Sequence, residues 1–199
     1  MSAEFDEAKW FDQRTVASRP GGVSVSYAKL EWFRRKLNWG HRFLGVGQVP
    51  SQRWAVHLQK GLAEPALVVR AKPLTVAVYT AEFDCVAMLR FAQGVPGREN
   101  LREGDRLLSV NTFERRQTSA EAKRTFERDL IVGELSGGSM WFNVHPAIAD
   151  FLSDDAGAME ERKDEIGEWD RLETLSASYL RRFPNRCRNG NPYLSHLPA

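Results

Sequence analysis

The stretch Ala66–Thr80, ALVVRAKPLTVAVYT, indicates the fold class of this chain. Two runs rich in valine and leucine, 66–71 and 74–80, flank a Lys-Pro pair, a pattern typical of strands joined by a tight turn. In the second run Leu, Val and Val alternate with Thr, Ala and Tyr, as in a strand with one buried face. A connection this short joins antiparallel strands, because a parallel pair needs a long crossover.

Further short apolar runs, separated by turn residues, predict that the sheet extends in both directions from this hairpin. The expected additional strands are 42–49, 53–59, 85–91, 106–113, 129–135 and 140–144. Thr118-Ser119-Ala120-Glu121 is a capping box, which predicts one interrupting helix near 119–128. The sequence therefore predicts an α+β fold with a central antiparallel β-sheet, either open or curled towards a small barrel.

Helices are expected on both sides of this sheet in the sequence. The first covers 3–17, and the second begins after Ser26 and ends near Asn38. His145-Pro146 predicts the end of the sheet, followed by a short helix at 147–152 and a longer helix from 154 to about Phe183. These segments form one predicted domain, with N-terminal helices in 1–40, the β core in 42–145, C-terminal helices in 146–183 and an extended tail in 184–199.

Composition predicts a soluble cytoplasmic protein. The 199 residues are 42% hydrophobic and 27% charged, which is ordinary for a globular domain and argues against disorder. No apolar run approaches the length of a membrane span, and the start lacks the pattern of a secretory signal. Of the two cysteines, Cys85 is expected to be a buried apolar residue and Cys187 lies in a polar tail; a disulfide between them stays open.

The net charge of +2 conceals an asymmetry along the chain. Residues 24–60 carry seven cations and one carboxylate, Glu31, whereas residues 136–183 carry ten carboxylates and five cations. The chain is therefore basic early and acidic late, and the two blocks have the charges needed to pair within the fold or with a partner.

The sequence contains no motif of a metal, cofactor or catalytic site, so none is predicted. Its four histidines, His41, His57, His145 and His196, lack the spacing of metal ligands. Whether the protein is an enzyme stays uncertain, with the balance against it. As an alternative function we keep an enzyme whose site is assembled from strand ends, with His57, Asp84 and His145 as its titratable candidates.

Asn100–Asn111, NLREGDRLLSVN, resembles the "L-x-x-G-D-x-I-L-x-V-N" stretch of PDZ domains. The predicted helix at 119–128 follows where their peptide-groove helix would lie. The resemblance covers about thirty residues; there is no counterpart of the family's carboxylate-binding loop in 66–91, and Thr112 stands where the family usually has glycine. The resemblance therefore supplies no binding residues.

A basic and aromatic stretch, LEWFRRKLNWGHRF from Leu30 to Phe43, carries the functional prediction. Either its rings fill the core while its cations face water or the acidic helix, or the stretch forms a binding surface. We predict a non-catalytic protein-interaction module whose partner is another protein or a second copy, with no membrane partner. The alternative is single-stranded nucleic-acid binding. The candidate binding residues are Trp32, Arg34, Arg35, Lys36, Trp39, Arg42 and Trp54.

Overall fold

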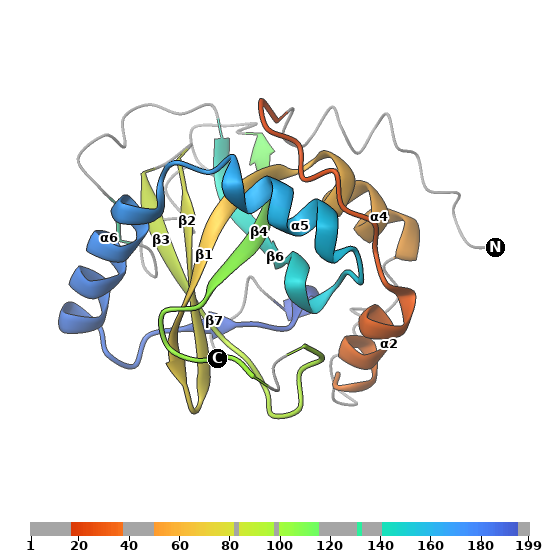
Figure 1. Ribbon diagram of the computed structural model, residues 1–199. Helices are drawn as coiled ribbons and strands as arrows, with labels where there is room; N and C mark the ends of the chain where they lie inside the picture. The colour runs from red at the N-terminus through yellow and green to blue at the C-terminus, as the bar shows by residue number, and fades with distance from the viewer. Residues whose placement is uncertain are drawn as a thin grey trace.

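The computed structural model describes residues 17–37, 50–81, 84–97, 100–115, 131–132 and 141–194. It confirms the predicted α+β class: helices surround a curled, mostly antiparallel sheet (Figure 1). The strand order is β5-β3-β2-β1-β4-β6, and β7 pairs with the outer edge of β3. The predicted helices at 3–17 and 119–128 and the predicted strand at 42–49 lie almost wholly or wholly outside the described residues.

The strands follow the predicted hairpin outwards. Strand β2 has the predicted bounds, 74–80, and pairs antiparallel with β1 and β3, and β4 pairs with β1 and β6. Strand β7 is the exception, because it runs parallel to β3. The bounds are β1 Leu62–Ala71, β2 Leu74–Thr80, β3 Cys85–Arg90, β4 Arg106–Arg115, β5 Ile131–Val132, β6 Trp141–Ile148 and β7 Arg188–Asn189.

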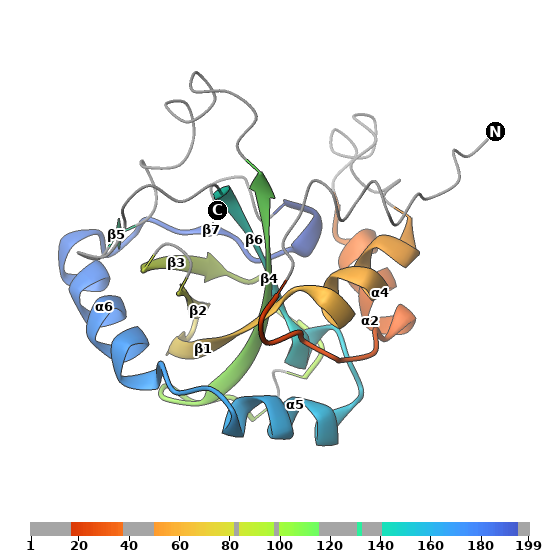
Figure 2. The ribbon, with the colours of Figure 1, turned by 90° about the horizontal axis from the view of Figure 1, so that it is seen from above.

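The sheet is buried on both faces, so the prediction of one buried face for 74–80 was wrong. Every residue of β2 is buried. Seen from above, the sheet curls round, with α4, α5 and α6 outside it and the C-terminal segment across its open side (Figure 2). Curling buries the inner face of the strands as well as the face that the helices cover, so a surface strand pattern is not required.

Residues 53–59 form part of a helix, not the predicted strand. Helix α4 spans Ser51–Lys60 and buries Trp54, His57 and Leu58. These residues are spaced by three and one along the chain and share one helix face. The error arose because seven mixed residues fit a period of two nearly as well as a period of 3.6.

The long helix predicted for 154–183 is two helices. Helix α5 spans Ala156–Asp164 and α6 spans Trp169–Arg182. Asp155 caps α5 by accepting a hydrogen bond from the amide of Ala158 at 3.2 Å. The break contains Gly167, a poor helix former, and Ile166, whose buried side chain enters the core between the helices.

The sheet continues past His145-Pro146, where the sequence predicted its end. Strand β6 runs to Ile148, and the predicted helix at 147–152 is reduced to the 3-10 turn η3, Ala149–Phe151. Within the described sheet β6 is the last strand beyond β4. An edge strand tolerates proline, because the missing amide would face away from its partner.

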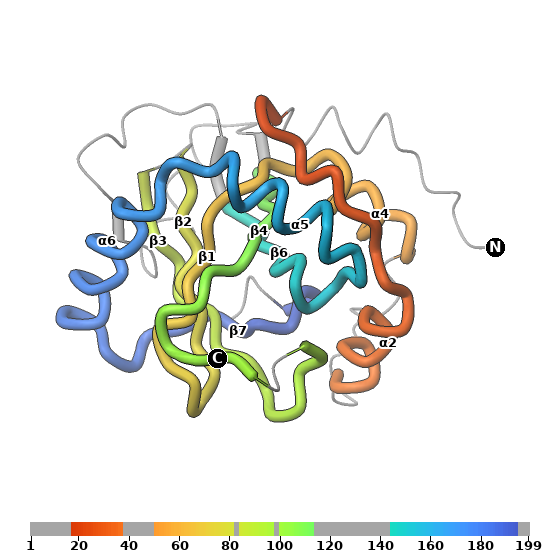
Figure 3. The backbone as a smooth tube through the Cα atoms, in the orientation of Figure 1, coloured from red at the N-terminus to blue at the C-terminus, as the bar shows by residue number. Residues whose placement is uncertain are grey.

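The N-terminal segment before α2 is bound along α4 and α5. From Arg19 to Ser26 the backbone follows the end of α4 and then reaches α2, Tyr27–Arg35 (Figure 3). The amide of Gly21 donates to the Gly61 carbonyl at 2.8 Å, and a Cβ on Gly21 would meet the Leu58 carbonyl oxygen at 2.3 Å. Helix α2 begins where predicted, but Ser26 makes no side-chain cap hydrogen bond.

The described part of the tail, 184–194, is not extended over the surface as predicted. Strand β7 and the 3-10 turn η4, Pro192–Leu194, cross the open side of the sheet, and Arg188 donates to the Val144 carbonyl of β6 at 3.1 Å. A Cβ on Gly190 would lie 2.6 Å from the ring of Phe91, so this contact requires glycine. The C-terminal segment thus joins both edges of the curled sheet.

Both described cysteines are free thiols: Cys85 is buried, as predicted, and Cys187 is half-buried. None of the helices in the described part of the chain is long and apolar enough to cross a membrane.

Candidate functional site

Helix α2 presents one face to the core and the opposite face to solvent. Leu30, Phe33 and Leu37 are buried, as the predicted helical spacing requires. On the outer side Arg34 and Arg35 are exposed, and Tyr27 is 59% exposed. Tyr27 is the exposed large hydrophobic residue among the described residues. A tyrosine beside arginines is a composition favoured at protein interfaces.

The cations of this face are held within the helix. Arg34 Nε lies 2.6 Å from one oxygen of Glu31, and Arg35 Nε lies 3.1 Å from the other. The hydrogen bonds from Arg34 and Arg35 hold the pKa of Glu31 below its usual range. Lys36 Nζ lies 5.1 Å from the ring centre of Trp32, a cation–π distance. We call Tyr27, Trp32, Arg34, Arg35 and Lys36 the α2 face.

Lys29 of the basic region and Arg19, which precedes that region, pair with the acidic region instead. Lys29 Nζ lies 2.9 Å from a carboxylate oxygen of Asp154, and it also donates to the Ser153 carbonyl. Arg19 makes a two-pronged pair with Glu168, at 2.8 and 3.1 Å. The two charge blocks therefore pair in part within the fold.

Of the predicted aromatic anchors, Trp54 is part of the core. It is 8% exposed, stacks on His57 at 5.4 Å between ring centres, and meets the edge of Tyr193 at the same separation. Burial raises the pKa of Tyr193 to about 12. Trp32 is half-buried and packs against Phe33. Trp39 and Arg42 lie outside the described residues.

The residues of the enzyme alternative fall into two groups. His57 Nε2 lies 2.8 Å from the Val110 carbonyl oxygen, and its Nδ1 lies 3.4 Å from Thr112 Oγ1. Thr112 is paired across the sheet with His145, so the structure brings the two histidines to the same part of β4 and β6. Asp84 belongs to a different group, on β2 and α6.

Asp84 is a buried carboxylate at the turn between β2 and β3. Its backbone has a φ of 44°, in the left-handed region that aspartate tolerates better than most residues. It accepts hydrogen bonds from the Tyr79 hydroxyl at 2.9 Å and from Arg171 Nε and Nη2 at 2.9 and 2.5 Å. Burial and the bond to Asp84 raise the pKa of Tyr79, and the bond to Asp84 raises that of Arg171. This arrangement attaches α6 to the sheet.

A second buried carboxylate, Glu64, accepts a backbone hydrogen bond beyond the end of the β1–β2 pairing. The pairing of β1 with β2 begins at Ala66, so Glu64 lies before the first paired residue of β1. There the Glu64 side chain accepts the amide of Ala81 at 3.0 Å. Next to it on β4, Ser109 donates to Asn111 at 2.6 Å, and Asn111 donates to the Tyr79 carbonyl at 3.1 Å. These buried polar groups serve the backbone of the sheet.

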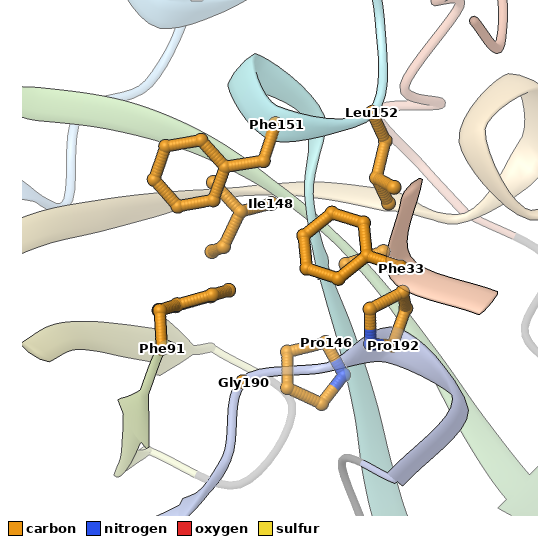
Figure 4. Close-up of a pocket in the computed structure, with 9 residues that line it drawn as sticks. Phe33, Phe91, Pro146, Ile148, Phe151, Leu152, Gly190 and Pro192 are labelled. Atoms are coloured by element: carbon orange, nitrogen blue, oxygen red, sulfur yellow. The ribbon is translucent and has the colours of Figure 1, made fainter. Parts of the chain in front are cut away.

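The structure also contains an apolar gap between α2, the inner end of the sheet and the C-terminal segment. Its lining includes Phe33, Phe91, Pro146, Ile148, Phe151 and Pro192 (Figure 4). The side chains in Figure 4 point towards one another across it. The gap is too narrow to admit a water molecule, and so it is an imperfection of core packing with no room for a substrate.

A group of arginines at the end of α6 was not predicted as a surface from the sequence. Arg181 and Arg182 were counted within the acidic region, and Arg186 and Arg188 fell beyond it. A signal was present, since no carboxylate side chain follows Glu173 in the sequence. A window aligned with the helix end would have shown a second basic region.

No protein-family model, curated protein sequence or solved structure matches this chain. Among the described residues, no group of three His, Cys, Asp or Glu side chains is placed to hold a metal ion. The functional argument therefore depends on the placement of side chains.

Proposed function

We propose that this protein is a protein-interaction module that binds an acidic surface of a partner protein through the α2 face. The observation that supports this function is the exposure of Tyr27 beside Arg34 and Arg35 on a helix whose opposite side is fixed in the core. A fixed helix loses little freedom on binding, which favours affinity. The role of the cations is to guide an acidic partner, and the role of Tyr27 is to anchor it.

A protein partner suits this face better than a nucleic acid does. Glu31 lies between Arg34 and Arg35 and is ionised, since their hydrogen bonds lower its pKa. A phosphate backbone brought to the two guanidiniums would also meet this carboxylate. Protein surfaces carry both signs of charge and adapt to such a mixed face.

A second copy of this chain is one acidic partner that the molecule itself offers. The exposed carboxylates of α5 and its C-terminal end are Glu160, Glu161, Asp164 and Glu165. Contact between α2 of one copy and α5 of another would be head-to-tail, so it would form a ring or a chain of copies. Self-association is therefore measured separately from binding to other proteins.

The test compares partners recovered from cells by proximity labelling with the wild-type protein and with R34E/R35E/K36E. We expect the variant to lose specific partners, because charge reversal removes both the steering and the contacts. Y27A is expected to weaken binding of the same partners, although it leaves the charge of the α2 face unchanged. Each candidate partner is then purified and titrated against the wild type, and its affinity is expected to fall as salt increases.

The matched control is R181E/R182E, which reverses two exposed arginines on a different part of the molecule. It should retain every partner that R34E/R35E/K36E loses. Sedimentation of the purified protein at low and high salt tests the second copy as the partner. The proposal is overturned if R34E/R35E/K36E retains all partners and all self-association of the wild type.

A further inference from the structure

A second basic surface lies where α6 ends beside the β1–β2 hairpin. Arg70 of β1 donates to the Pro184 carbonyl at 3.1 Å, which joins the hairpin to the segment after α6. Arg181, Arg182 and Arg186 are exposed on that segment, while Arg70 is half-buried. We call these four arginines the α6-end patch. In Figure 1 the lower end of α6 lies across the sheet from α2.

The patch is organised around an aromatic ring. The guanidinium carbon of Arg182 lies 5.1 Å from the ring centre of Phe183, and that of Arg186 lies 4.5 Å from it. Phe183 is in turn held by the edge of Tyr179, with 5.7 Å between ring centres. A guanidinium placed over a ring keeps N–H groups at its edge, and these suit the oxygens of a phosphate.

The charge of this patch is more uniform than that of the α2 face. From Thr174 to the end of the chain there is no carboxylate side chain, and this stretch contains three of the four patch arginines together with the buried Arg188. On the hairpin side Glu103 accepts the amide of Ala71 at 3.4 Å, so the helix end is the more basic part. Arg181 and Arg182 lie in the last turn of α6, where cations interact favourably with the helix dipole. This interaction does not explain Arg186 and Arg70, because neither residue belongs to the helix.

We infer that the α6-end patch binds the phosphate backbone of a single-stranded nucleic acid. Phosphates repeat along such a strand at short intervals, and four neighbouring arginines, three of them exposed on a segment without carboxylate side chains, match that repeat. Arginine is suited to this role because its planar fork binds phosphate through paired N–H groups and stacks on bases. This activity is independent of the α2 face and of the protein partner proposed above.

The experiment measures binding of a fluorescein-labelled uridine oligonucleotide, about 15 nucleotides long, to the full chain by anisotropy. Between about 50 and 200 mM salt, four phosphate contacts predict a slope of log K against log salt near −3. R181Q/R182Q removes two of these contacts. We expect it to weaken binding at low salt about tenfold or more and to reduce the slope to about −1.5.

The matched control is R34Q/R35Q, which removes two exposed arginines from the α2 face and should leave the affinity and the slope unchanged. Urea unfolding of both variants establishes that each remains folded. The inference is overturned if the wild type shows no saturable binding, or if R34Q/R35Q loses as much affinity as R181Q/R182Q. It is also overturned if polyglutamate of equal charge displaces the oligonucleotide equally well, because an acidic protein would then be the partner.

Discussion

Two regions of the molecule use arginine and lysine in different ways. One is the seam, where α5 and α6 meet the rest of the fold. The other is the pair of exposed basic surfaces, the α2 face and the α6-end patch. In the seam Arg171, Arg19 and Lys163 each reach a carboxylate on another element. On the α2 face Arg34 and Arg35 reach only as far as Glu31, on their own helix, among the contacts described. Cations of the first kind hold elements together, whereas those of the second kind face solvent, where we propose that they meet a partner.

Burial accounts for this difference. Asp84 is 2% exposed, and the pair of Lys163 and Asp150 is 11% and 17% exposed, whereas Arg34 and Arg35 are 53% and 74% exposed. Burial opposes the charge of Lys163, but Asp150 and Glu160 outweigh it and hold its pKa above the ordinary value. Exposed pairs are screened by water and salt and contribute little to stability.

The largest expected effect is at the Asp84–Arg171 pair. R171M keeps most of the apolar stem of the side chain but removes the guanidinium from a buried carboxylate, which costs about 3 kcal/mol of unfolding free energy. D84N should cost less, because the Arg171 guanidinium is 39% exposed and water can replace its partner. Urea unfolding at constant slope measures both changes. If D84N were the more destabilising, the buried carboxylate would not be what the pair stabilises.

A smaller, pH-dependent effect is expected at Arg19 and Glu168. Burial raises the pKa of Glu168, but the hydrogen bonds and charge of Arg19 outweigh it, so the folded pKa lies below the usual value. A carboxyl group with a lowered folded pKa stabilises the fold above its unfolded pKa, and this contribution is lost as the pH falls through the folded pKa. E168Q should therefore cost about 1 kcal/mol at neutral pH.

The wild type and E168Q should approach each other in stability as the pH falls below the usual pKa of a glutamate, because Glu168 then becomes protonated in the folded protein too. Urea unfolding of both proteins across this range checks the prediction. An equal difference at every pH would mean that Glu168 acts through packing and not through its charge.

The smallest effect on stability is expected at the exposed surfaces. R34Q/R35Q and R181Q/R182Q should not shift the urea midpoint beyond the loss of weak helix-dipole interactions, since all four side chains are exposed. Their effects should instead appear in binding. If R34Q/R35Q or R181Q/R182Q unfolded the protein, the replaced arginines would stabilise the fold as the seam cations do. The distinction between the two regions would then be wrong.

Local pattern predicted the elements that are long and regular in the sequence. The alternation of 74–80 identified β2 at its bounds, and the buried residues of α2 have the predicted spacing. The same reasoning failed for 53–59, which is helical, and at Gly167, where one predicted helix becomes two. Short segments fit both periods, and the contacts that decide between them are made with residues distant in the chain.

For the proposed binding surface, the sequence placed arginine beside tryptophan but could not say which of them reach solvent. It included Trp54, which is buried, and it did not include Tyr27, which is exposed. Arg181 and Arg182 were counted within a region whose net charge is negative, so their surface was not recognised. The sequence also did not indicate that Arg70, more than a hundred residues earlier, joins the hairpin to their segment.

By itself the sequence determined the α+β class, the antiparallel hairpin at the centre of the sheet and the opposite charges of its two regions. These features depend on residue periodicity and composition, which are local properties of the chain. Only the tertiary structure decided that Lys29 and Arg19 pair with Asp154 and Glu168 while Arg34 and Arg35 remain exposed. Whether a cation stabilises the fold or stays exposed to solvent depends on burial and on a carboxylate within reach, and both are set by contacts between distant segments.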